Sequence, residues 1–118
     1  MAFKILDMIA EGLGLDKGYF TRVSQEHAMT INHYPPCPDP SVAMGIGGHT
    51  DPNLITFLQQ DQYGLQMHKD GKWLGVDSIP NAFVINIGYQ LEVIIISNLS
   101  LWFVNRTMRL NYCWFYLI

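Results

Sequence analysis

The first regular pattern of apolar positions has the period of a helix. Between residues 3 and 13, apolar side chains recur every three or four positions, as they do along one face of an α-helix. This face consists of Phe3, Leu6, Ile9, Ala10 and Leu13. Gly12 and Gly14 follow as the stop signal that commonly ends a helix. The pattern predicts a helix over residues 3–13.

After Gly18 the pattern becomes extended. Residues 27–34 alternate between two faces, and Ala28, Thr30, Asn32 and Tyr34 share one of them. Four prolines follow within residues 35–40. Because proline cannot continue a helix or donate to a central strand, we expect a rigid loop after the extended segment.

The middle of the chain has the pattern of several short strands. They are expected at Leu54–Gln59, Leu65–His68, Trp73–Val76 and Ala82–Ile87. The Asp70-Gly71 pair, between the second and the third, is a strong hairpin signal. The last is an apolar run apart from Asn86, and such a run is typical of a strand buried on both faces. Short strands at intervals of about ten residues indicate a mainly β fold, either a sandwich or a barrel.

Composition changes abruptly near Val93. All 10 glycines, all 6 prolines and all 10 acidic residues lie at or before this position, and residues 94–118 contain none of them. The apolar run from Val93 to Val104 spans about 12 residues, against the roughly 20 that cross a bilayer, so a membrane partner is not expected. The tail could be a C-terminal amphipathic element. We favour a division into a domain of residues 1–93 and an unrelated apolar tail of residues 94–118, translated from a truncated gene model or a retained intron.

The overall composition is that of one small globular domain. The chain has 118 residues, of which 49% are hydrophobic, and this share excludes intrinsic disorder. A net charge of −3 with scattered basic residues predicts no nucleic-acid partner. The two cysteines, Cys37 and Cys113, form neither a zinc-finger spacing nor a disulfide framework. With no signal peptide at the N-terminus, we expect a reducing compartment, the cytoplasm.

One triplet carries candidate metal chemistry. In an extended segment, His49 and Asp51 project to the same side, so an imidazole and a carboxylate converge on one point. One more histidine would complete the two-histidine, one-carboxylate face that binds non-haem Fe(II). Taken alone the signal is weak, since composition gives about 0.2 such triplets by chance. The alternative is a loop aspartate before Pro52 beside an unrelated histidine.

The surroundings of the triplet strengthen the metal interpretation. Five blocks occur in order, at residues 32–38, 47–61, 64–66, 72–76 and 79–88. Together they resemble the plant-type Fe(II)- and 2-oxoglutarate-dependent dioxygenases of the isopenicillin-N-synthase-like group, over about residues 3–93. The block at 47–61 looks closest to the hydroxylases of specialised metabolism, such as the tropane-alkaloid hydroxylases.

The resemblance implies a fold, a cofactor set and site residues. The fold would be a mainly β, partial double-stranded β-helix, or jelly roll, preceded by a short helix. His49 and Asp51 match two iron ligands of the family, and Tyr34 and Asn32 match residues that hold 2-oxoglutarate. The family uses O2 and 2-oxoglutarate to oxidise a small-molecule substrate, here a specialised metabolite. No residue of this chain is assigned as a catalytic acid or base.

The chain also departs from the family pattern. The family's second histidine ligand, some fifty residues after the His-x-Asp triplet, and the Arg-x-Ser motif beyond it are missing, because the last histidine is His68 and neither Arg106 nor Arg109 has serine two positions later. We therefore expect the middle part of an enzyme, truncated at both ends. Half of a jelly roll leaves strands open to pairing, so self-association is expected. The alternative function is a non-catalytic truncated product or pseudoenzyme without turnover.

Overall fold

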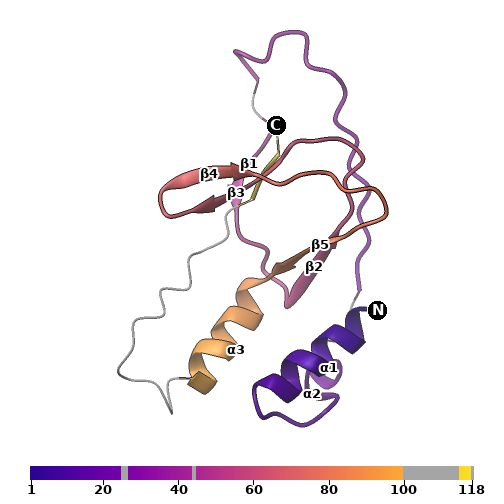
Figure 1. Cartoon of the computed structure of the whole chain (residues 1–118), viewed down its shortest axis with the longest axis vertical. Helices are drawn as coiled ribbons and strands as arrows, with labels where there is room; N and C mark the ends of the chain where they lie inside the picture. The colour runs from indigo at the N-terminus through magenta and orange to yellow at the C-terminus, as the bar shows by residue number, and fades with distance from the viewer. Residues whose placement is uncertain (25–26, 44, 100–114, 118) are drawn as a thin grey trace. The chain divides into compact units, whose positions relative to one another are not determined.

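The structure is a computed structural model that describes residues 1–24, 27–43, 45–99 and 115–117. It divides into two compact units, residues 1–38 and residues 39–118, and each is described by itself. Figure 1 shows the order of helices and strands along the chain. None of the described helices is long and apolar enough to cross a membrane.

The first unit contains two helices, α1 (Ala2–Gly12) and α2 (Tyr19–Val23). The helix predicted for residues 3–13 is confirmed, and Leu6 and Ala10 of its apolar face are buried, whereas Phe3 at its start is 39% exposed. Phe20 of α2 is buried as well. The loop between the helices is held by the amide of Gly18, which donates to Asp7 Oδ1 at 2.9 Å. Gly18 itself has a φ of 78°, a left-handed conformation that favours glycine.

The extended segment predicted at residues 27–34 does not form a strand. Residues 27–34 belong to neither a helix nor a strand. Their apolar side chains, such as Met29 and Ile31, are exposed. Alternation of apolar and polar residues favours an extended backbone, but a strand also requires a neighbour for its hydrogen bonds.

The second unit contains two small antiparallel sheets. Its strands are β1 (Ile46–His49), β2 (Ile55–Leu58), β3 (Leu65–Lys69), β4 (Lys72–Gly75), β5 (Val84–Ile87) and β6 (Phe115–Leu117). One sheet has the order β1-β6-β3-β4, and the other pairs β2 with β5. The helix α3 (Tyr89–Leu99) follows β5 directly (Figure 1). Leu54, Leu65 and Leu91 form the buried apolar part of this unit.

The predicted hairpin is confirmed. Strands β3 and β4 pair in antiparallel register from Gln66 opposite Gly75 to Lys69 opposite Lys72. Asp70 and Gly71 have φ values of 50° and 77°. Positive φ at both central residues is the requirement of a two-residue type I′ turn, which explains the Asp-Gly pair.

The prediction that the run ending in β5 is buried on both faces is wrong. Ile85 and Ile87 are 40% and 47% exposed, whereas Asn86 between them is only 4% exposed. Strand β5 pairs with β2 in a two-stranded sheet, and the exposure of Ile85 and Ile87 shows that their face of this ladder is only partly covered by the described residues. An apolar run indicates a strand that could be buried on both faces, but burial requires two covering layers.

The expectation of a mainly β fold is also corrected. The described residues form a mixture of short helices and small sheets, with α3 where no helix was predicted. Ile94, Ile95 and Ile96 are β-branched, and such residues lower helix propensity only slightly. Helix α3 passes through Val93, the predicted domain boundary. Most of the predicted tail, residues 100–114 and 118, lies outside the described residues, so the boundary at Val93 remains a prediction.

Candidate metal centre

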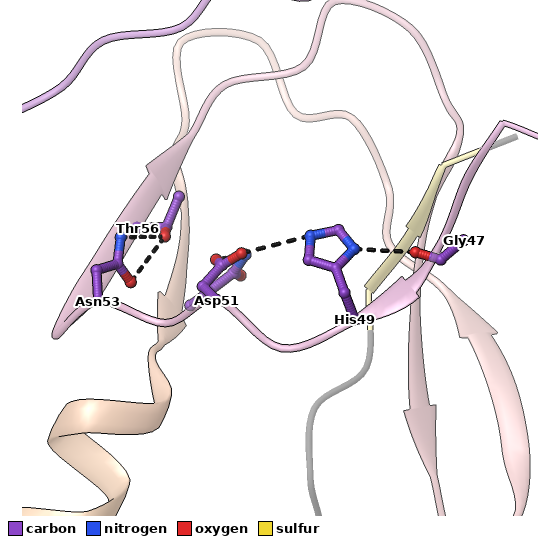
Figure 2. Close-up of polar contacts among 6 residues, drawn as sticks. Gly47, His49, Asp51, Asn53 and Thr56 are labelled. Carbon is purple, nitrogen blue, oxygen red and sulfur yellow. Dashed lines mark hydrogen bonds and ion pairs between the residues drawn. The ribbon is translucent and has the colours of Figure 1, made fainter.

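The His49–Asp51 pair lies where a strand turns into the loop before the next strand. His49 is the last residue of β1, and Asp51 follows in the connection to β2. Figure 2 shows the two side chains pointing toward each other. The distance between His49 Nε2 and Asp51 Oδ1 is 3.5 Å. The structure therefore brings together the two residues that the sequence selected as metal ligands.

The position of the proton on His49 follows from its second ring nitrogen. Nδ1 lies 2.9 Å from the backbone oxygen of Gly47 (Figure 2). Because a carbonyl oxygen can only accept, Nδ1 carries the hydrogen and donates it. In the neutral ring this leaves the lone pair on Nε2. A metal-binding histidine has this arrangement, with its outer ring nitrogen bonded to a backbone carbonyl.

Asp51 is held more firmly than His49. The His49 side chain is 45% exposed and that of Asp51 only 16%. Asp51 Oδ2 accepts from Asn86 Nδ2 at 3.5 Å, the long end of hydrogen-bond distances. The Asp51 backbone oxygen accepts from the amide of Tyr89 at 2.7 Å. One carboxylate oxygen therefore faces Asn86, and the other faces His49.

This arrangement suits a cation. With Nδ1 protonated, Nε2 of His49 and Oδ1 of Asp51 are two acceptors that face each other across 3.5 Å. Two facing lone pairs repel unless a proton or a cation lies between them. Bonds of about 2.1 Å from nitrogen and oxygen to one metal ion can span such a gap. A neutral imidazole with a carboxylate is also a donor set that suits Fe(II). The two residues therefore fit two positions of a metal site.

A third protein ligand does not appear in the part of the chain that the structure describes. Those residues contain no group of three or more histidine, cysteine, aspartate or glutamate side chains that could hold a metal. His68 belongs to β3, where its ring packs against Trp73 with centroids 5.1 Å apart. The pair at His49 and Asp51 therefore offers two candidate ligands, and the described residues bring no third one to it.

The predicted 2-oxoglutarate residues belong to the first unit. Asn32 and Tyr34 lie in its exposed segment before the proline-rich loop. Their role in binding 2-oxoglutarate stays a prediction that rests on the resemblance.

Neither a role for Asn86 nor the helix α3, which begins at Tyr89, was predicted from the sequence. Asn86 was included in the apolar run 82–87 without a role. Its polar side chain within that run was the one available signal, because an amide at a buried strand position needs a hydrogen-bond partner.

Comparison with known proteins identifies the family. Residues 25–101 match the family described as the 2OG-Fe(II) oxygenase superfamily. The chain is 55% identical over 97 residues to hyoscyamine 6-dioxygenase of Hyoscyamus niger. It is 45% identical over 98 residues to flavanone 3-dioxygenase 2 of Oryza sativa subsp. japonica. It is 41% identical over 106 residues to 1-aminocyclopropane-1-carboxylate oxidase 5 of Arabidopsis thaliana.

The matches cover much of this chain and little of the relatives. In each case 80% of the chain is aligned, against 28%, 29% and 34% of the three relatives. The chain therefore spans about a third or less of the length of these curated relatives. The family match extends over residues 25–101 of the 118 and includes both His49 and Asp51. The resemblance seen in the sequence is confirmed, and the chain belongs to the 2OG-Fe(II) oxygenase superfamily.

Proposed function

We propose that this chain is part of an Fe(II)- and 2-oxoglutarate-dependent dioxygenase that hydroxylates or otherwise oxidises a small specialised metabolite. The observation that carries the proposal is the pair of facing acceptors, His49 Nε2 and Asp51 Oδ1, 3.5 Å apart. Family membership supplies the identity of the metal and of the co-substrate. The similarity to hyoscyamine 6-dioxygenase and flavanone 3-dioxygenase 2 supports a plant metabolite as the substrate class.

Two residues of this chain would bind the metal, and two others would bind the co-substrate. When bound, iron and 2-oxoglutarate together supply the activation of O2 for oxidation of the substrate. His49 and Asp51 would hold the metal from one side, with the His49 ring oriented by its hydrogen bond to Gly47. Asn32 and Tyr34 would bind 2-oxoglutarate through their amide and hydroxyl groups. All four are chemically suited to these roles.

The two sheets of the second unit support a jelly-roll origin. Both consist of antiparallel strands, as in a double-stranded β-helix. A cavity with a volume of about 390 Å³ is lined by Leu58 and Val84, from the β2–β5 ladder, and by Met67 and Gly75, from the β3–β4 ladder. Two sheets that contribute to one mainly apolar cavity are what part of a jelly-roll interior would present. We propose that these strands are part of that fold.

A second candidate is a product without turnover. The observation in its favour is that the described residues supply two metal ligands and no group of three. The family site needs two histidines and one carboxylate to fix the metal face. We therefore expect the 118-residue chain by itself to bind a divalent metal weakly and to release little or no CO2 from 2-oxoglutarate.

Metal titration of matched variants tests the proposal. Co(II) or Mn(II) should bind the unmodified chain measurably, and His49→Ala and Asp51→Ala should each abolish binding. His68→Ala is the control, because this histidine packs against Trp73 and should leave binding unchanged. Equal loss in His68→Ala, or binding that survives both site variants, would refute the site. Labelled-CO2 release measured alongside separates the candidates, since robust coupled oxidation would rule out a product without turnover.

A further inference from the structure

The most unusual side chain outside the ligand pair is that of Asn86. It is 4% exposed, while its neighbours on β5, Ile85 and Ile87, are 40% and 47% exposed. This reverses the expected order, in which a strand buries its apolar side chains and leaves its polar ones in solvent. Burying an amide is unfavourable unless it is hydrogen-bonded. The inversion therefore calls for a specific partner on the buried side.

That partner is Asp51. Nδ2 of Asn86 donates to Asp51 Oδ2 at 3.5 Å, across 35 residues of sequence. The orientation of the amide follows from chemistry, because a carboxylate oxygen can accept only from the NH2 end. Oδ1 of Asp51 is left to face His49. With one oxygen engaged by Asn86, the carboxylate is set to present the other to a metal.

The junction between β5 and α3, which begins at Asn86, also holds the backbone of the loop that contains Asp51. The amides of Gly88, Tyr89 and Gln90 donate to the backbone oxygens of Leu54, Asp51 and Asn53, at 2.9, 2.7 and 3.2 Å, respectively. These donors lie at the end of β5 and in the first turn of α3, whose amides have no partner within the helix. Side chain and backbone of Asp51 are thus both held from the β5–α3 junction.

We propose that Asn86 is a positioning residue for Asp51, and that the β5–α3 junction (residues 86–90) holds the metal-binding loop in place. The inference rests on the proposed role of Asp51 as a metal ligand. Outer partners of this kind orient a ligand and raise metal affinity without touching the metal. The Oδ1 atom of Asn86 is buried and has no hydrogen-bond partner among the described residues, so the bond from Nδ2 to Asp51 is the hydrogen bond that this side chain makes there.

The experiment compares three variants in Co(II) titrations. Asn86→Leu keeps the approximate size of the side chain and removes the donor, so the Kd should rise about 10–100-fold. Asn86→Gln keeps an NH2 donor and should recover part of the affinity. Asn53→Ala is the matched control, because its amide bonds Thr56 rather than Asp51 and its loss should leave the affinity nearly unchanged. Circular dichroism of each variant monitors folding.

A second measurement needs no substitution at Asn86. Added Zn(II) should shift the side-chain NH2 resonances of Asn86 in the unmodified chain. Those of Gln60, which bonds the Val76 carbonyl instead, should stay in place. A Zn(II) response at Asn86 together with the loss in Asn86→Leu would support the proposal.

The outcomes separate this inference from the proposed function. If Asp51→Ala abolishes binding while Asn86→Leu binds normally and the Asn86 resonances do not move, the positioning role is overturned and the metal site stands. If binding survives both His49→Ala and Asp51→Ala, the metal site fails and the positioning role fails with it.

Discussion

Replacing Gly88 with alanine is expected to destabilise the second unit by a measurable amount. A Cβ atom at this position would lie 2.6 Å from the carbonyl carbon of Asn53 and closer still to its carbonyl oxygen. Carbon atoms in contact are normally about 3.5–4.0 Å apart. The Asn53 side-chain oxygen Oδ1, at 2.5 Å, could turn away, but the two backbone atoms cannot, so the loop itself must move.

The magnitude follows from two contributions. Forcing a methyl group into a packed site costs about 1–3 kcal/mol. The amide of Gly88 also donates to the Leu54 oxygen at 2.9 Å, and a shift that breaks this bond adds about 0.5–1.5 kcal/mol. A total near 3 kcal/mol corresponds to a fall in Tm of roughly 12–24 °C for a domain of this size.

The assay is thermal unfolding followed by circular dichroism at one fixed protein concentration, because association makes Tm depend on concentration. Gly47→Ala is the matched control in the same unit, since a Cβ atom there would meet nothing within 4 Å. It should leave Tm unchanged or raise it slightly. If Gly88→Ala melts within a degree or two of the unmodified chain, the junction tolerates displacement and the steric reasoning is wrong.

Three further predictions concern other parts of the chain. Hydrogen bonds from the Ser41 hydroxyl and, secondarily, from the Ser41 amide hold the pKa of the Asp39 carboxyl below 3.8, so the stability they contribute is lost as pH falls through that lowered pKa. In an NMR titration, Ser41→Ala should raise the pKa of Asp39 toward 3.8, and an unchanged pKa would contradict this cause. The exposed Ile85 and Ile87 predict self-association. Light scattering should therefore show species larger than 13.5 kDa that diminish in Ile85→Lys, and a monodisperse monomer would refute this. Ending the chain at Val93 removes β6, whose Phe115 lies opposite His49 in the sheet, so Co(II) binding should weaken even though the backbone contacts from residues 88–90 to the Asp51 loop remain; unchanged Co(II) binding would show that the tail is dispensable for the site.

Local features were predictable where neighbouring residues decide the conformation. The helix over residues 3–13 follows from apolar periodicity, and the β3–β4 hairpin follows from the need for positive φ at Asp70 and Gly71. The convergence of His49 and Asp51 follows from their two-residue spacing. The family followed from the ordered blocks and was confirmed by the match over residues 25–101.

The failed predictions concern burial and pairing. The apolar run ending in β5 predicted burial on both faces, yet Ile85 and Ile87 are 40% and 47% exposed, so the described residues cover that side of the β2–β5 sheet only in part. The alternation in residues 27–34 predicted an extended segment, but whether such a segment becomes a strand depends on a partner elsewhere in the chain.

The sequence alone determined the chemistry of this protein, because residue types and short spacings specify a His-x-Asp pair and the family to which it belongs. The tertiary structure decided how that pair is held. Asn86 is 35 residues from Asp51, and no local pattern could indicate that its amide meets that carboxylate. The amides at the start of α3 likewise acquire their partners only when the chain folds back on the loop after β1. Contacts between distant residues depend on the packing of whole elements, so only the folded chain shows what contacts Asp51.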